Sequence, residues 1–174
     1  LDTGREKRYN KTNLLCKCKL AVRPHESEEM KMSLPGVKRY LKEYGLDGDI
    51  IELHESSATV QEAASALHTE PDRIAKSLSF LVDERPVVVV VSGQSKVDNH
   101  KYKAFFHKKA KMIPSEDVER LTGHPVGGVC PFDLPGGVDV YLDESLKKYD
   151  TVYPACGSTS SAIRIALPDL ERTS

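Results

Sequence analysis

A lysine, a glycine-rich loop and a late loop of small residues are the parts of this 174-residue sequence whose residue types could do chemistry. Lys76 lies between a predicted helix end and a predicted strand start, where its cation could bind phosphate or polarise a carbonyl group. A lysine in such a place is more often a solvated surface charge, because lysine is rarely buried without a partner. Lys76 alone therefore predicts no activity.

The glycine-rich loop from Gly123 to Phe132 holds three glycines and two prolines. Glycine lets the backbone approach a ligand closely, and successive amides can hold a phosphate, a carboxylate or a developing oxyanion. A purely structural turn explains the same composition equally well. If the loop binds a ligand, the candidate residues are Gly123, His124, Gly127, Gly128, Val129 and Pro131.

The late loop runs from Tyr153 to Ala162 and carries four consecutive hydroxyl side chains from Ser158 onward. With Gly157 and Ser158 it could border a pocket for a small polar group, although a plain polar loop fits the composition too.

The stretch from Lys96 to Lys111 holds six lysines and two histidines against one acid, Asp98. Its interleaved aromatic residues are typical of a nucleic-acid backbone-binding face, or of a helix with one solvated and one buried side. Both descriptions can hold together. The candidate RNA-binding residues are Lys101, Lys103, Lys108 and Lys109.

Standard catalytic signatures are missing, including the G-x-S-x-G elbow, the Walker loop, G-x-G-x-x-G and H-E-x-x-H. Cys16 and Cys18 have no matching Cys/His pair to complete a zinc shell, so no metal and no cofactor are expected. Cys130 and Cys156 lie in the two loops without an evident histidine partner, which favours packing over covalent catalysis.

The hydrophobic pattern predicts alternating short helices and strands. Five consecutive valines from Val87 indicate a strand buried on both faces. The predicted helices run from Pro35 to Gly45, from a capping box at Thr59 to Leu67, from Asp98 to Phe106, from Ser115 as cap to Gly123, and near Asp169, with one helical turn opened by Pro71. The predicted strands are 50–53, 77–82, 87–91, 111–113, 129–130, 138–142, 151–153 and 162–165. This order predicts an α+β fold with a curved mixed sheet or barrel.

Composition is that of one ordinary globular domain, with 39% hydrophobic and 29% charged residues. Residues 1–32 are predicted to form a poorly structured extension, and residues 33–174 the domain. No apolar stretch approaches a membrane span or a signal-peptide core, and the cysteine spacing suggests no disulfide framework, which together favour a cytoplasmic protein. Residues 32–174 hold 17 Lys and Arg against 21 Asp and Glu, so strong nonspecific binding to nucleic acid is not expected.

The three chemical segments, in this order, resemble the YbaK/ProX family of trans-acting editing proteins, a domain also inserted in bacterial prolyl-tRNA synthetases. The resemblance rests on Lys76-Ser-Leu, on the G-x-x-x-G-G-[VI]-x-P loop from Gly123 to Pro131, and on Cys156-Gly-Ser before a strand. It covers roughly residues 33–171.

The resemblance implies a metal-independent aminoacyl-tRNA deacylase with a YbaK-like fold, acting on the acceptor end of mischarged tRNA. Lys76 would position the terminal phosphate or the substrate carbonyl, and the glycine-rich loop would orient the ester. Gly157 and Ser158 would border the pocket, and water or the substrate itself would supply the nucleophile. An aminoacyl-tRNA synthetase is a candidate partner.

Two departures from the family pattern are Asp133, where many relatives have glycine, and the N-terminal extension. A module that holds tRNA or a nucleotide without turnover is the alternative function, and a regulator acting through protein contacts is a third. The sequence names neither the amino acid removed, nor the tRNA, nor the oligomeric state.

Overall fold

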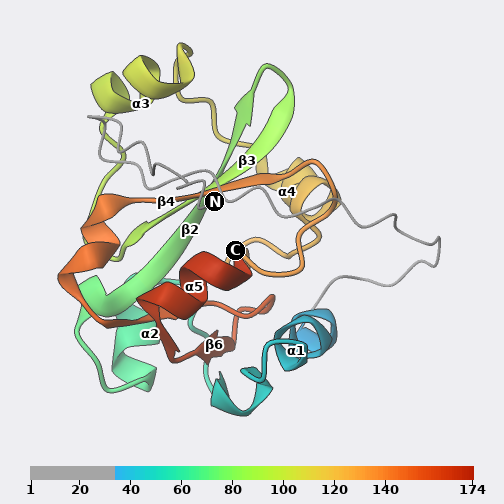
Figure 1. The fold of residues 1–174 in the computed structure, drawn as a ribbon, viewed down its shortest axis with the longest axis vertical. Coiled ribbons are helices and arrows are strands. Elements are labelled where there is room, and N and C mark those ends of the chain that lie inside the picture. The colour runs from blue at the N-terminus through green and yellow to red at the C-terminus, as the bar shows by residue number, and fades with distance from the viewer. Residues whose placement is uncertain (1–33) are drawn as a thin grey trace, which may run out of the picture.

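A five-stranded mixed sheet is the centre of the protein in the computed structural model, which describes residues 34–174 (Figure 1). The strand order is β4-β3-β2-β5-β7, and β1 pairs with β6 in a second, two-stranded sheet. The strands are β1 (Ile50–Glu52), β2 (Ile74–Val82), β3 (Arg85–Ser92), β4 (Asp139–Leu142), β5 (Thr151–Pro154), β6 (Ser161–Ile163) and β7 (Ile165–Ala166). The β2–β3 and β5–β7 pairs are antiparallel, whereas β3–β4 and β2–β5 are parallel. This mixed sheet confirms the predicted α+β class.

Five α-helices surround the sheet in the described residues (Figure 1). They are α1 (Leu34–Lys42), α2 (Val60–Ala66), α3 (Asn99–Phe106), α4 (Ser115–Thr122) and α5 (Leu167–Thr173), with 3₁₀ turns η1 (Asp47–Asp49), η2 (Pro71–Arg73) and η3 (Glu144–Lys148). The predicted capping box of α2 is confirmed, since Thr59 and Glu62 bond each other's backbone amides. Asp98 caps α3 as predicted, accepting from the amides of His100 and Lys101.

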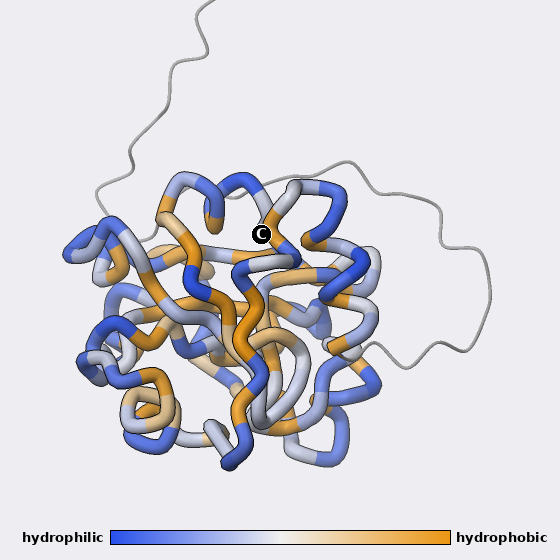
Figure 2. Tube along the Cα trace, turned by 90° about the horizontal axis from the view of Figure 1, so that it is seen from below, coloured by the Kyte–Doolittle hydropathy of each residue, from blue (hydrophilic) through white to orange (hydrophobic). Residues whose placement is uncertain are grey.

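One hydrophobic core lies on each side of the central sheet. Hydrophilic residues lie mostly on turns and outer helices (Figure 2). Val88 and Val90 face the larger core, which α1 and α5 cover. Val87, Val89 and Val91 face a second core under α3. All five valines are at most 3% exposed, which confirms the predicted two-sided burial.

Four local predictions are wrong. Residues 111–113 form no strand, because only Met112 bridges to the sheet, opposite Phe80. Residues 129–130 lie in coil and pair with no strand. The predicted strand 162–165 divides at the exposed Arg164, because β6 and β7 pair in different sheets. Ser115 is the first residue of α4 and not its cap, since the preceding position is Pro114, which has no side-chain acceptor.

The predicted extension of residues 1–32, including Cys16 and Cys18, lies outside the described residues.

Candidate functional site

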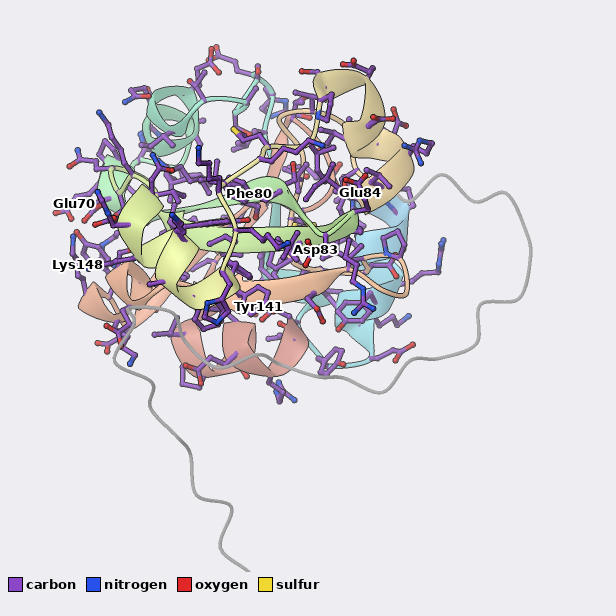
Figure 3. All side chains as sticks on the ribbon, turned by 90° about the horizontal axis from the view of Figure 1, so that it is seen from above. Glu70, Phe80, Asp83, Glu84, Tyr141 and Lys148 are labelled. Atoms are coloured by element: carbon purple, nitrogen blue, oxygen red, sulfur yellow. The ribbon has the colours of Figure 1, made fainter. Side chains whose placement is uncertain are left out.

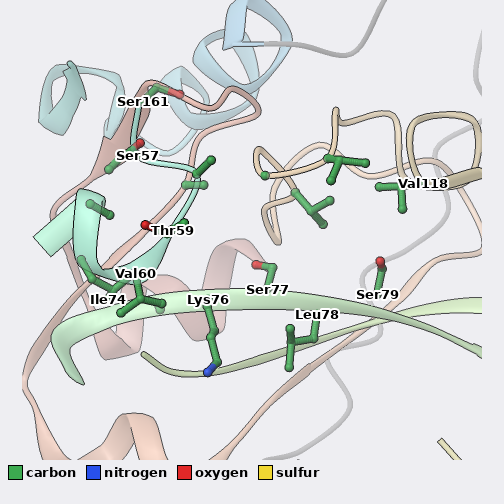
Figure 4. Close-up of a pocket in the computed structure, with 18 of the residues that line it drawn as sticks. Ser57, Thr59, Val60, Ile74, Lys76, Ser77, Leu78, Ser79, Val118 and Ser161 are labelled. Carbon is green, nitrogen blue, oxygen red and sulfur yellow. The ribbon is translucent and has the colours of Figure 1, made fainter. Parts of the chain in front are cut away.

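A cavity of about 230 Å³ opens along β2, between the segment that leads into α2, the beginning of α4 and the glycine-rich loop (Figure 4). Its polar lining consists mainly of hydroxyl groups, and its apolar lining comes from small and branched residues. The two most exposed large hydrophobic side chains of the described residues, Met112 and Val126, both line it, with exposures of 59% and 57%. The other lining residues used below are Val60, Lys76, Ser77, Ser79, Gly127, Val129 and Tyr153.

The edge of β2 is open where it passes this cavity. The ladder with β5 ends at the pair Ala75–Pro154, and the next bond on that edge is from the Ile113 amide to the Ser79 carbonyl, 3.0 Å. Residues two apart in such a ladder direct their N–H and C=O groups to the same edge. Ser77 lies between the two bonded positions, so its backbone N–H and C=O face the cavity.

The Ser77 hydroxyl is also available to a ligand. Its oxygen is buried and has no hydrogen-bond partner. Figure 4 shows Ser77 and Ser79 on the side of β2 that faces Ser57 and Thr59. A buried polar group without a partner costs about 1–3 kcal/mol, which a ligand that bonds to it would offset. Sequence reasoning missed Ser77 as a site residue, although the Ser-Leu-Ser alternation after Lys76 was a signal for it.

Lys76 lines the cavity and lies within β2, not before the strand as predicted. Nζ donates to the Gly93 carbonyl over 2.8 Å, and the side chain leaves β2 on the side opposite Ser77 (Figure 4). Gly93 in turn packs on the cavity-lining Val60, whose Cγ1 lies only 2.8 Å from the position of a Cβ on this glycine. Burial lowers the pKa of Lys76, and the Asp72 carboxylate partly opposes this shift.

The glycine-rich loop and the late loop pack against each other at Gly128 and Ser158. A Cβ on Gly128 would lie 2.9 Å from the Ser158 backbone, so the two loops can approach this closely only with glycine there. Gly127 has φ +83° and lines the cavity together with Val129. The predicted substrate-binding residues that are not part of the lining are Gly123, Gly128, Pro131, Gly157 and Ser158.

A model of the aminoacyl-tRNA editing domain matches residues 54–173. The chain belongs to this family. It is 42% identical to the uncharacterized protein YwhH of Bacillus subtilis (strain 168), over 82% of this chain and 92% of that protein. It is also 30% identical to a proline–tRNA ligase of Latilactobacillus sakei. The matched region covers 51% of this chain and 16% of that enzyme.

The fold agrees with this membership. A crystal structure of a candidate trans-editing enzyme for prolyl tRNA synthetase superimposes with a TM-score of 0.73 and 30% identity, covering 83% of this chain and 91% of that one. The crystal structure of hypothetical protein APE2540 gives 0.72 at 27% identity, covering 79% and 92%. The expected resemblance to YbaK-like editing domains is confirmed.

His124 of the editing domain lies in the interior, with no exposed surface, and its side chain does not reach the cavity. Its Nε2 is 2.9 Å from the Phe132 carbonyl oxygen and 3.4 Å from Cys130 Sγ, a histidine contact that the sequence had not predicted for this cysteine. Its Nδ1 has no partner. Burial lowers the pKa of His124, which favours the neutral ring. The prediction that His124 binds the substrate is therefore not supported by its position. Its contact with the Phe132 carbonyl stabilises the glycine-rich loop.

Both described cysteines are buried thiols. Burial raises the pKa of Cys130 to about 12 and also raises the pKa of Cys156. A thiolate is the reactive form, so both residues stay protonated and act in packing. Asp133, the departure from the family pattern, is absent from the cavity lining; its carboxylate lies beside Gly36 of α1.

The lysines of the basic stretch are exposed around α3, and its aromatic residues pack inward. The rings of Tyr102 and Phe106 pack against each other in the second core, with centroids 4.5 Å apart and planes tilted by 41°. The predicted division into a lysine side and a buried aromatic side is thus confirmed. Lys108 pairs with Asp83 over 2.8 Å. The other RNA-binding candidates are Lys101, Lys103 and Lys109.

Within residues 34–174, no three His, Cys, Asp or Glu side chains gather in a way that could hold a metal ion. None of the helices in this part of the chain is long and apolar enough to span a membrane.

Proposed function

We propose that this editing domain is a trans-acting deacylase that hydrolyses the ester of mischarged tRNA. The observation that carries the proposal is the open edge of β2, where Ser77 presents a backbone N–H, a carbonyl and an unpartnered hydroxyl to a small cavity. An aminoacyl ester has the complementary groups, namely a carbonyl that accepts hydrogen bonds and an amino group that donates them.

The size of the cavity supports an aminoacyl group as its occupant. Its volume of about 230 Å³ is below the roughly 300–1,000 Å³ of sites for drug-sized ligands. The terminal adenosine would therefore stay outside, where Met112 and Val126 offer an exposed apolar rim on which a base can pack.

Lys76 would contact a part of the substrate that extends out of the cavity. Because its ammonium leaves β2 on the side away from Ser77, contact with the terminal phosphate fits its position better than contact with the ester carbonyl. Gly127 and its neighbours in the loop would orient the ester from the opposite wall.

Water activated with help from the substrate is the nucleophile in this proposal. Among the described residues that line the cavity, only Lys76 and Tyr153 have titratable side chains, so this part of the lining offers no carboxylate, imidazole or thiol as a general base. Metal-independent hydrolysis is part of the proposal, and EDTA should leave turnover unchanged.

The test is deacylation of a panel of mischarged tRNAs, beginning with tRNA acceptors for proline because relatives of this chain include proline–tRNA ligases. Lys76→Ala should lower turnover at least about tenfold, since a positioned cation contributes more than about 1.4 kcal/mol. Lys147→Ala, an exposed lysine on η3, is the matched control and should keep wild-type turnover.

Near-native turnover by Lys76→Ala would refute the role of this lysine. Tight binding of the tRNAs by the wild-type protein without any turnover would instead identify a non-catalytic binding module.

A further inference from the structure

A polar network connects η2, just before the first residue of β2, with the last residue of β3 and the turn that follows it. The proposed reaction does not by itself account for this network. Asp72 of η2 accepts from the Ser92 hydroxyl over 2.8 Å and from the Gln94 amide over 3.3 Å, both through Oδ1. The Ser92 hydroxyl also lies 2.7 Å from that of Ser95. One carboxylate oxygen therefore fixes the turn that follows β3.

That turn contains Gly93, the residue that holds Lys76. A Cβ on Gly93 would lie 1.9 Å from the Pro71 carbonyl oxygen, so only glycine allows η2 and the turn to pack so closely. The Gly93 carbonyl points to the Lys76 ammonium at 2.8 Å. The position of the cation thus depends on the position of the turn.

The charges around Lys76 come from three elements. Asp72 on η2 favours the charged lysine, whereas Lys96 after β3 disfavours it. Lys148 of η3 pairs with the second oxygen of Asp72, Oδ2, over 3.1 Å. Glu70 accepts from the Tyr149 hydroxyl over 3.3 Å. Figure 3 shows Glu70 and Lys148 together at one end of the molecule, far from the hairpin turn at Asp83 and Glu84.

We propose that Asp72 is a positioning residue for Lys76: it fixes the Ser92–Gln94 turn so that the Gly93 carbonyl holds the lysine ammonium in one place on its side of β2. The carboxylate touches no substrate and acts through the turn and through its charge. This inference rests on the proposed function, because it assigns Asp72 to the lysine that the deacylation is proposed to use.

Kinetics of two Asp72 variants test the positioning. Asp72→Ala removes the acceptor for Ser92 and Gln94 and should lower kcat/KM for deacylation of a mischarged tRNA at least about fivefold. Asp72→Asn keeps an acceptor oxygen and should lose less. Lys148→Met is the matched control: it removes the ion pair at Oδ2 but leaves the turn bonded at Oδ1, so its kcat/KM should stay within about twofold of the wild type.

Direct titration of Lys76 supplies a readout that a merely structural role would not move. The lysine Cε signal, assigned with Lys76→Ala, can be followed by NMR against pH in the full protein. Since a nearby negative charge favours the ammonium form, Asp72→Asn should move the Lys76 midpoint to lower pH. Melting temperatures of all variants show whether the comparison is made on folded protein.

Wild-type kcat/KM in Asp72→Ala, or an unchanged Lys76 midpoint in Asp72→Asn, would overturn the inference. If Lys76→Ala is inactive while Asp72→Ala is fully active, the inference fails but the proposed function stands. If Lys76→Ala is itself fully active, the proposed role of the lysine fails first.

Discussion

The neighbouring strands β2 and β3 use the same side of the sheet for different purposes. They pair antiparallel, with Ser77 opposite Val90 and Ser79 opposite Val88. The two valines are fully buried in the main core, whereas Ser77 faces the cavity. The difference follows from the neighbours: β3 has a strand on each edge, but β2 is paired with β5 only at its beginning.

This contrast separates stability from recognition within one hairpin. The valines of β3 contribute buried apolar area, and β2 retains an unsatisfied hydroxyl that costs folding energy but can serve a ligand. Substituting the two members of the cross-strand pair Ser77–Val90 one at a time should therefore change stability when the valine is replaced and activity when the serine is replaced.

The largest expected effect is on stability, from β3. Val90→Ala removes two methyl groups from a fully buried side chain and should lower the free energy of unfolding by about 2–3 kcal/mol. The activity of the folded fraction should stay close to that of the wild type. Urea unfolding and deacylation on the same preparation check both. Activity lost in folded protein would mean that the core side of the pair also shapes the site.

The next effect is on activity, from β2. Ser77→Val makes the strand resemble β3, removes the cavity hydroxyl and should lower deacylation at least about tenfold, or about 1.4 kcal/mol. Its melting temperature should not fall, because valine suits a strand and the change removes the unpartnered hydroxyl at this position.

The matched control for this change is Ser77→Thr, which has the shape of valine but keeps the hydroxyl. It should retain clearly more activity than Ser77→Val. Equal losses in both variants would indicate that bulk, and not the hydroxyl, is what the cavity rejects.

The smallest expected effect concerns the other side of the hairpin, where α3 covers Phe80 and the odd-numbered valines of β3. Neutralising Lys101, Lys103, Lys108 and Lys109 together should weaken tRNA binding and lower its salt slope by about one for each lysine that contacts a phosphate. The contribution of Lys108 should be the smallest, because it already pairs with Asp83. An unchanged slope, measured by binding titrations at several salt concentrations, would confine the RNA to the cavity side.

Local signals in the sequence were sufficient for most elements. The capping box at Thr59, the Asp98 cap and the valine run each act within a few residues, and all three occur as predicted. The α+β class followed from the order of the predicted helices and strands, and the family resemblance followed from the order of Lys76-Ser-Leu, the glycine-rich loop and the late loop. Strand 129–130 and the unbroken strand 162–165 were wrong because pairing depends on partners that are distant in the chain.

The candidate site shows the same division. Residue types and order identified Lys76 and the two loops, since a cation and close-packing glycines are properties of single positions. Only the tertiary structure revealed that the Lys76 ammonium donates a hydrogen bond to the Gly93 carbonyl. It also revealed that His124 lies in the interior and that Ser77 faces the cavity. These outcomes depend on which strand edge stays unpaired and which turn packs beside it, and both are decided by contacts between segments far apart in the sequence.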